Sequence, residues 1–238
     1  MSKSTAESSQ DTKVSIAGTP GAAITITAVS LAAQAVVTAA NTLAAGALVE
    51  LGAIAHMPEL EGELALVVSA TGSQFVLDID TTAYAQAGGT GTAVPQTWVE
   101  IANCSDYNGF DGSASDIEAS HMRSAAVESR PGLEDFGNIT FNIGVDNADA
   151  GQLAMRAAKR KRLVTHFLIE LPSGALRAFS GYVKKFPESA GTNKLLTSSV
   201  EIRIPGAVVS GAPVVATGFD VRPRFGVGSA TAGANVAT

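Results

Sequence analysis

Two segments in which apolar and polar residues alternate constrain the fold of this chain more than any other feature. In residues 138–145 and 196–204, apolar side chains recur at every second position apart from Ser198. This period of two is typical of a strand that is buried on one face only. The opposite faces carry small or polar residues, namely Asn138, Thr140, Asn142, Gly144, Thr197, Ser199, Glu201 and Arg203. The chain is therefore predicted to build a sheet with one apolar face and one polar face.

Shorter alternating runs separated by turn residues extend this prediction to most of the chain. Residues 165–171 and 176–185 are expected to pair as a hairpin around the turn at 172–174. One helix interrupts the strands, with Asp146 as the expected N-cap. The cations of Lys159–Arg162 favour its C-terminal end, where they interact well with the helix dipole. The predicted fold class is therefore mainly β with one flanking α-helix.

A polar loop, Ser120–Gly132, separates two extended stretches in the middle of the chain. It carries charges of both signs, and Met122 and Val127 are among its few apolar residues. Pro131 restricts its own φ and Gly132 tolerates a positive φ, so Arg130–Gly132 is expected to form a sharp corner where the loop closes.

Charge is distributed unevenly along the chain. The net charge is −6, and residues 21–94 contain six acids but neither lysine nor arginine. The remaining residues carry equal numbers of acids and bases, so the whole net charge lies in this segment. A composition shift of this kind marks a domain boundary. The short strands between its turns predict a compact, acidic β-barrel of about seventy residues.

No constellation of residues predicts catalysis, a metal site or a cofactor. Residues 106–117 approximate a calcium loop, but Phe110 and Ile117 stand where oxygen ligands are required. The three histidines are scattered, and the lone Cys104 can form no disulfide within the chain. The basic run Lys159–Arg162 is expected to be a solvated helix end rather than a nucleic-acid site. We therefore expect that the protein is not an enzyme.

Four stretches resemble the major tail tube proteins of long-tailed, non-contractile phages. They are Ser113–Val145, Phe167–Gly174, Phe179–Pro187 and Leu196–Ala207, in the order and with the spacing of that family. The resemblance covers residues 95–209 together with 13–18. It implies a tail-tube β-sandwich or barrel with one flanking helix, into which the small all-β barrel is inserted before Trp98.

The acidic barrel itself resembles the accessory half-domain of ubiquitin-activating enzymes, a module that recurs in phage structural proteins. The matching stretches are Ala35–Thr38, Leu48–Gly52, Met57–Gly62, Val67–Leu77 and Gly88–Thr90, whereas Ala40–Leu43 departs from the family pattern. This second resemblance implies a fold only. The expected domains are an N-terminal arm with the first strand (1–20), the inserted barrel on the outer surface (21–94), the tail tube domain (95–209) and a flexible C-terminal tail (210–238).

The tail tube resemblance implies a structural virion protein whose subunits form hexameric rings, stacked into a conduit for DNA ejection. The implied partners are further copies of the chain, tail terminator and tail tip proteins, and a tape-measure protein in the lumen. DNA would pass without specific binding, and no cofactor is implied. Because the sequence lacks both a run of eighteen apolar residues and an apolar N-terminal core, we expect no membrane span. We expect assembly in the host cytoplasm and a final location in the virion tail.

The resemblance also assigns roles to individual residues. Phosphate affinity comes chiefly from Lys and Arg, so a wall along which DNA slides should be neutral or acidic. The residues expected to face the lumen are Thr140, Asn142, Thr197, Ser199, Glu201 and Arg203, the last only if an acid pairs with it. The loop is expected to contact a neighbouring subunit through Ser120, His121, Met122, Arg123, Val127, Glu128 and Arg130.

Two alternatives stand beside this interpretation. One is a monomeric, surface-binding β module whose acidic barrel recognises a partner or a carbohydrate, and the other is a secretion-system tube subunit. A binding module would concentrate aromatic residues and arginine on its polar faces. The small side chains of the predicted polar faces instead favour a tube subunit.

Overall fold

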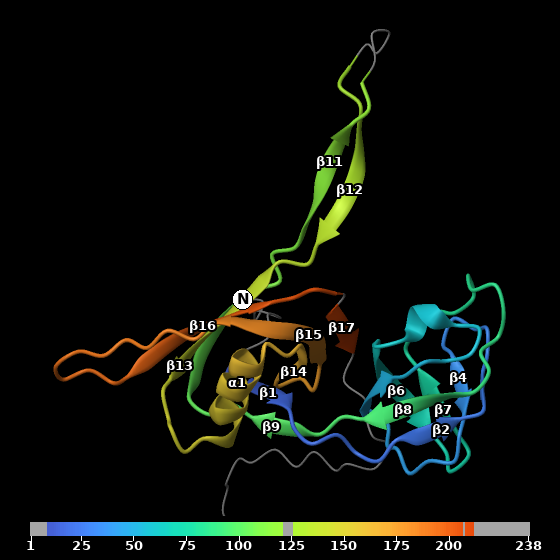
Figure 1. Ribbon diagram of the computed structural model, residues 1–238, viewed down its shortest axis with the longest axis horizontal. Coiled ribbons are helices and arrows are strands. Elements are labelled where there is room, and N and C mark those ends of the chain that lie inside the picture. Colours follow the sequence, from blue (N-terminus) through green and yellow to red (C-terminus); the bar gives the residue numbers. More distant parts are fainter. Residues whose placement is uncertain (1–8, 121–125, 207, 212–238) are drawn as a thin grey trace, which may run out of the picture.

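The computed structural model describes residues 9–120, 126–206 and 208–211. Figure 1 shows three parts: a large sheet with one helix, a small barrel beside it, and a long hairpin that projects from the large sheet. These parts confirm the prediction of a mainly β fold with one flanking helix. No helix in the described part of the chain is long and apolar enough to cross a membrane.

The large sheet, here called the body, contains eight antiparallel strands in a nearly closed arrangement. Seven of them follow the order β10-β13-β16-β15-β14-β1-β9, and β17 pairs with β15. The strands are β1 (Lys13–Ala17), β9 (Trp98–Glu100), β10 (Cys104–Gly109), β13 (Asn138–Gly144), β14 (Thr165–Glu170), β15 (Leu176–Lys185), β16 (Thr197–Arg203) and β17 (Val208–Gly211). The predicted hairpin is the β14–β15 pair, and its turn uses Gly174 at a φ of 82°.

Three phenylalanines lie at the centre of the body. The rings of Phe167 and Phe179 stack with centroids 5.5 Å apart, and the ring of Phe141 lies 6.4 Å from that of Phe167. All three side chains are fully buried, as is Met155 from the helix. Aromatic rings bury large areas and prefer such offset or tilted contacts, so this cluster dominates the packing of the body.

The helix α1 (Ala150–Lys161) packs against β1, β9 and β15. Its N-cap is Asp149, whose carboxylate accepts a hydrogen bond of 2.8 Å from the backbone amide of Gln152. The prediction of Asp146 as the cap was therefore wrong. Asp146 instead accepts a hydrogen bond from the Ala148 amide in the preceding turn. The predicted C-terminal end is confirmed, because Arg162 adopts a left-handed conformation there.

The small barrel is a seven-stranded sheet in the order β2-β8-β5-β6-β7-β4-β3, and a bridge between Val29 and Gly88 joins its ends. It has its own core of fifteen buried apolar residues around Phe75. Its elements are β2 (Ile24–Ile26), β3 (Ala28–Val29), β4 (Val36–Thr38), β5 (Leu48–Leu51), the short helix η1 (Pro58–Leu60), β6 (Leu64–Ala70), β7 (Gln74–Leu77) and β8 (Gly91–Pro95).

The barrel packs directly against the body. Leu48, Leu64 and Leu66 of the barrel share an apolar cluster with Leu168 and Ala178 of the body. Polar groups surround this contact: Nε2 of His166 lies 3.2 Å from the carboxylate of Glu50, and Nδ1 lies 3.0 Å from the Ser180 hydroxyl. The two connecting segments also pair, since the Gly18 and Gly21 amides donate to the Thr97 and Pro95 carbonyls. The barrel is thus held by packing as well as by its linkers.

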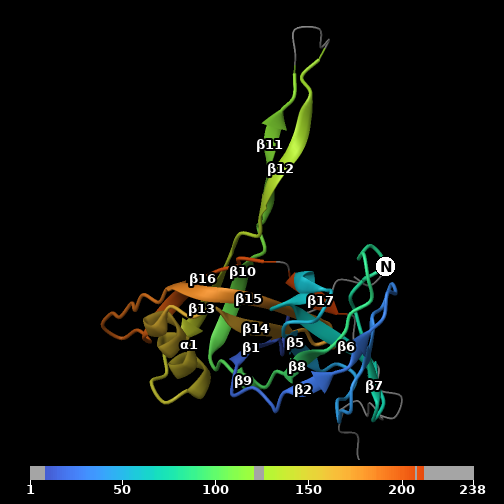
Figure 2. The same cartoon turned by 45° about the vertical axis from the view of Figure 1, so that its right-hand side comes forward.

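The hairpin consists of β11 (Ser113–Glu118) and β12 (Ser129–Asp135), which pair with each other and with no other strand in the described residues. It points away from the body in both views (Figures 1 and 2). The prediction of a corner at Arg130–Gly132 was wrong, because these residues lie inside β12. Pro131 is accepted there since the hairpin has only two strands, and an edge strand can leave a missing N–H facing solvent.

Candidate functional site

The polar face of the body is formed mainly by β13 and β16. Their register pairs Asn138 with Arg203, Thr140 with Glu201, Asn142 with Ser199, and Gly144 with Thr197. All six residues predicted to face a lumen therefore lie on one side of this pair, while Ile139, Phe141 and Ile143 are buried on the other. Because side chains directly opposite each other share a face, the alternation in the two segments was sufficient to group them.

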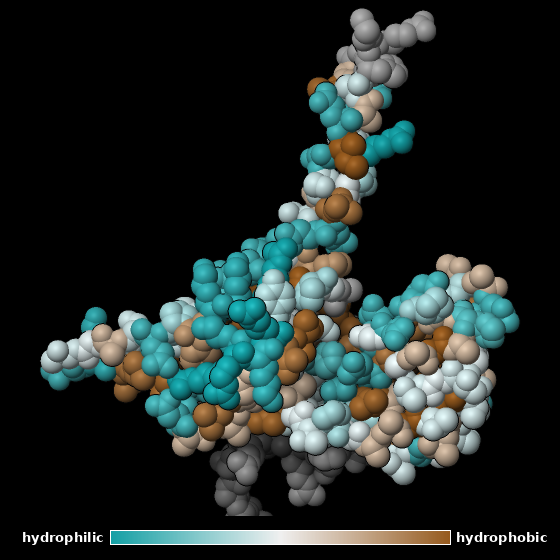
Figure 3. Space-filling model, viewed as in Figure 1, coloured by the Kyte–Doolittle hydropathy of each residue, from teal (hydrophilic) through white to brown (hydrophobic). Residues whose placement is uncertain are grey.

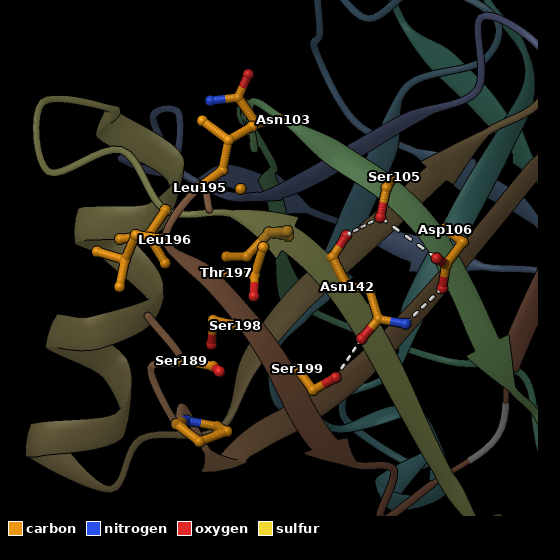
Figure 4. A pocket seen from close by; sticks show the side chains of 14 residues that line it. Asn103, Ser105, Asp106, Asn142, Ser189, Leu195, Leu196, Thr197, Ser198 and Ser199 are labelled. Atoms are coloured by element: carbon orange, nitrogen blue, oxygen red, sulfur yellow. Dashed lines mark hydrogen bonds between the residues drawn. The ribbon is translucent and has the colours of Figure 1, made fainter. Parts of the chain in front are cut away.

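Side-chain hydrogen bonds link three strands across this face. Asn142 donates to the Asp106 carboxylate of β10 at 2.6 Å and accepts a hydrogen bond from the Ser199 hydroxyl. Ser105 donates to the backbone carbonyl of Asn142 at 3.0 Å. Figure 4 shows these groups beside a hollow of about 780 Å³ that continues towards Leu195 and Leu196. The network restrains the side chains of Asn142 and Ser199.

The cations of this face each contact a carboxylate. Arg203 lies 2.6 Å from Asp135, as the prediction for an arginine at this position required. The Glu201 carboxylate lies 2.8 Å from the Lys184 ammonium and 2.9 Å from that of Lys185, and these hydrogen bonds lower the pKa of Glu201, with Lys184 contributing most. A cation with a carboxylate neighbour presents less positive potential to an approaching phosphate.

Sequence reasoning missed four members of this face: Asp106, Asp135, Lys184 and Lys185. Lys184 follows the buried Val183 on β15, so alternation was a usable signal for it. Lys185 reaches the same carboxylate because a bulge interrupts the β15–β16 register after Val183. Nothing in the local sequence indicates that bulge or the two aspartates that come from other strands.

The hairpin is the second candidate surface. Every described residue of β11 and β12 is exposed except the half-buried Gly132. Two acidic side chains secure its base. Asp111 accepts a hydrogen bond of 3.0 Å from the backbone amide of Asn138, and Asp135 accepts one of 2.8 Å from the backbone amide of Gly137. The Gly137 amide makes the largest contribution to a lowered pKa of Asp135, and Arg203 adds to it. The base is therefore ordered although the strands beyond it are solvated.

Four of the residues predicted for subunit contact are described. The Ser120 hydroxyl accepts a hydrogen bond from the Glu128 amide at 3.0 Å, Val127 is exposed, and Arg130 lies opposite Ile117. His121, Met122 and Arg123 lie outside the described residues. The exposed apolar residues Ile117 and Leu133 were missed, because they lie just outside Ser120–Gly132, in the two stretches predicted to be extended.

The remaining motifs have structural explanations. Residues 106–109 of the incomplete calcium loop belong to β10, and the described part of the chain holds no group of three residues able to bind a metal. Burial raises the pKa of the Cys104 thiol to about 11, with a contribution from the neighbouring Asp106. Lys159–Arg162 lies at the end of a helix that packs, through Met155, against the buried face of the body.

The sequence matches the family described as "Phage tail tube protein, TTP" over residues 55–212, which is more than half of the chain. The chain therefore belongs to the phage tail tube protein family. No sequence among the curated proteins matches it. Membership makes the protein a structural subunit that assembles with copies of itself and with other tail proteins in the virion tail, and it favours this role over a surface-binding module.

Proposed function

We propose that this chain is the major tail tube subunit of a long-tailed, non-contractile phage. Six copies form a ring, and stacked rings enclose the channel through which DNA leaves the virion. A tape-measure protein occupies this channel before ejection, and terminator and tip proteins close the ends of the tube. Assembly takes place in the host cytoplasm.

The observation that carries this proposal is the polar face of the body. Most of its side chains are small, Asn142 is hydrogen-bonded to Asp106 and Ser199, and Lys184, Lys185 and Arg203 each contact a carboxylate. A wall of this kind offers few sites at which phosphates bind, because tight phosphate binding needs free lysine or arginine. We propose that Thr140, Asn142, Thr197, Ser199, Glu201 and Arg203 line the channel.

The acidic barrel belongs on the outside of this tube. A domain of its length has a radius of gyration of about 11 Å, so six copies would fill a channel wide enough for DNA. Its acids also repel one another less when they are spread out in solvent. The apolar contact that includes Leu168 attaches the barrel to the body of its own subunit.

Cryo-electron microscopy of the assembled protein tests both assignments. We expect rings of six with the β13–β16 polar face on the inner wall and residues 21–94 on the outside. A second preparation joins Gly18 to Gln96 and replaces Leu168 by Thr, so that the uncovered apolar patch does not cause aggregation. It should form tubes with the same channel and a smaller outer diameter. Persistent monomers of the full chain in every buffer would refute the proposal.

A further inference from the structure

The hairpin combines negative charge with exposed apolar side chains. Residues 113–135 contain five acids and two arginines. Ile117, Val127 and Leu133 are 56%, 84% and 87% exposed. Hydrophobic patches interrupt the hydrophilic surface of the hairpin in Figure 3. Large apolar residues exposed to this degree on an element without a core of its own are typical of a surface that binds a partner.

A groove at the end of α1 has the complementary character. It has a volume of about 520 Å³ between the C-terminal turn of α1 and the end of β15, and is here called the α1–β15 groove. Leu163 and Val164 line it and are 51% and 58% exposed. Its charged lining residues, Lys159, Arg162 and Lys184, are all basic. Lys184 contacts Glu201, whereas Lys159 and Arg162 have no ion-pair partner in the described part of the chain.

The hairpin cannot fill the groove of its own subunit. It leaves the body at Asp111 and Gly137 and extends away from α1 in both views (Figures 1 and 2). Its six-residue strand β11 spans roughly 20 Å at about 3.3 Å per residue, so the hairpin reaches well beyond its own body. The groove that the hairpin can fill, and that matches it in charge and apolar character, therefore belongs to another copy of the chain.

We propose that the hairpin of one subunit docks into the α1–β15 groove of a second copy of the chain. This inference rests on the proposed tube function and assigns its subunit contact. Leu163 and Val164 meet the apolar residues of the hairpin, while Lys159 and Arg162 face its carboxylates. Apolar burial supplies the affinity, and the opposite charges select the partner surface and its orientation.

The contact joins two different surfaces, so it is heterologous. A heterologous contact leaves each subunit with one free hairpin and one free groove, and it propagates into a closed ring or an open stack. Self-assembly of a tube needs a contact of this type. The hairpin, which gains little stability from its own two strands, becomes ordered by the partner that it binds.

Two variants that can form only one hairpin–groove contact with each other test the docking without requiring tubes. The first variant replaces Ala114–Glu134 by Asn-Gly, which closes the strands at Ser113 and Asp135 and keeps the groove. The second keeps the hairpin and carries Lys159→Glu and Arg162→Glu. Sedimentation velocity should find each variant monomeric alone and a one-to-one complex when they are mixed. The complex should weaken by about tenfold between 0.05 and 0.5 M salt, because screening removes the charge contribution.

Charge exchange in the full chain tests the pairing itself. The groove variant Lys159→Glu/Arg162→Glu and the hairpin variant Glu118→Lys/Glu128→Lys should each fail to form tubes, while the four changes together should restore them. Lys194→Glu and Glu61→Lys, at exposed positions outside both surfaces, serve as matched controls and should form tubes. Circular dichroism confirms that each variant is folded, and Leu163→Asn provides a groove variant without charge reversal.

The outcomes separate the two proposals. If wild-type chains and the groove variant both form tubes, the docking is overturned and the tube function stands. The same conclusion follows if wild-type chains form tubes and both double variants fold, but the fourfold variant stays monomeric. If wild-type chains never form tubes but the mixed pair associates, the docking stands and the tube function fails. Absence of association in the mixed pair overturns the docking in either case.

Discussion

Two pairs of neighbouring strands in this protein have similar local structure and opposite surroundings. In the body, β13 and β16 place alternate residues in a core where Phe141 and Val200 are fully buried. In the hairpin, β12 has the same seven-residue length as β13, yet none of its residues is buried. An isolated two-stranded hairpin is at best marginally stable in water. The residues of β13 and β16 therefore build the core of the subunit, whereas those of β11 and β12 remain exposed and, as we propose, offer a surface to another copy of the chain.

The largest expected difference between the two pairs comes from removing one apolar side chain from each. Phe141→Ala should lower the free energy of unfolding by about 3–5 kcal/mol, because it leaves a cavity among the buried rings. Leu133→Ala, on the exposed β12, should change it by less than about 0.5 kcal/mol. Urea unfolding of the monomer, followed by circular dichroism, measures both. Equal losses would show that the hairpin is part of the folding core.

A buried side-chain amide secures the end of β13, and the described part of the hairpin has no counterpart to it. The Gln152 side chain donates to the carbonyls of Ala102 and Gly144 at 3.0 and 2.9 Å, and accepts from the Asp146 amide. Gln152→Leu removes these three hydrogen bonds to buried backbone groups and should cost about 2–4 kcal/mol. Arg160→Gln, on the exposed side of the same helix, is the matched control and should remain close to wild type in the same urea experiment.

Hydrogen exchange extends the comparison to the assembled protein. In the monomer, amides of β13 should exchange slowly and those of β11 and β12 rapidly, because the latter pair has no buried side. On assembly, we expect protection of the hairpin to rise by about tenfold or more while that of β13 changes little. Mass spectrometry of peptides from monomers and tubes provides the measurement. Unchanged exchange in the hairpin would indicate that it stays solvated in the tube.

The smallest expected effect concerns acid pH at the base of the hairpin. The pKa of Asp135 is lowered from its ordinary value of 3.8, first by the Gly137 amide and then by Arg203. A carboxylate with a lowered pKa stabilises the folded state above its ordinary pKa, and this contribution disappears as the pH falls through the lowered value. Wild-type protein should therefore lose thermal stability below about pH 4 more steeply than Asp135→Asn does.

Arg203→Gln is the matched variant for this titration. It removes the cation and keeps the Gly137 donor, which is the larger cause of the shift. Its melting temperature should therefore retain most of the acid dependence of the wild type. If Arg203→Gln removed the dependence as completely as Asp135→Asn, the ion pair rather than the backbone amide would govern the base of the hairpin.

The sequence by itself determined the parts of the fold that depend on neighbours along the chain. Alternation identified the strands around Phe141 and Val200 together with their polar faces, and the cations of Lys159–Arg162 marked the end of the only α-helix in the described residues. These signals are local, because a strand or the end of a helix is specified by side chains that lie close together in the sequence. The composition shift at residues 21–94 likewise indicated a segment that forms its own core.

Only the tertiary structure decided which distant groups meet. Asp135 reaches Arg203, two lysines share Glu201 through a bulge, and Leu66 of the barrel packs near Leu168 of the body. Local rules also failed where a wider context prevailed: Pro131 and Gly132 suggested a corner, but pairing with β11 keeps them extended. Strand register and domain packing arise from contacts between residues far apart in the chain. No short stretch of sequence contains both partners of such a contact, so the charges of the polar face and the reach of the hairpin became visible only in three dimensions.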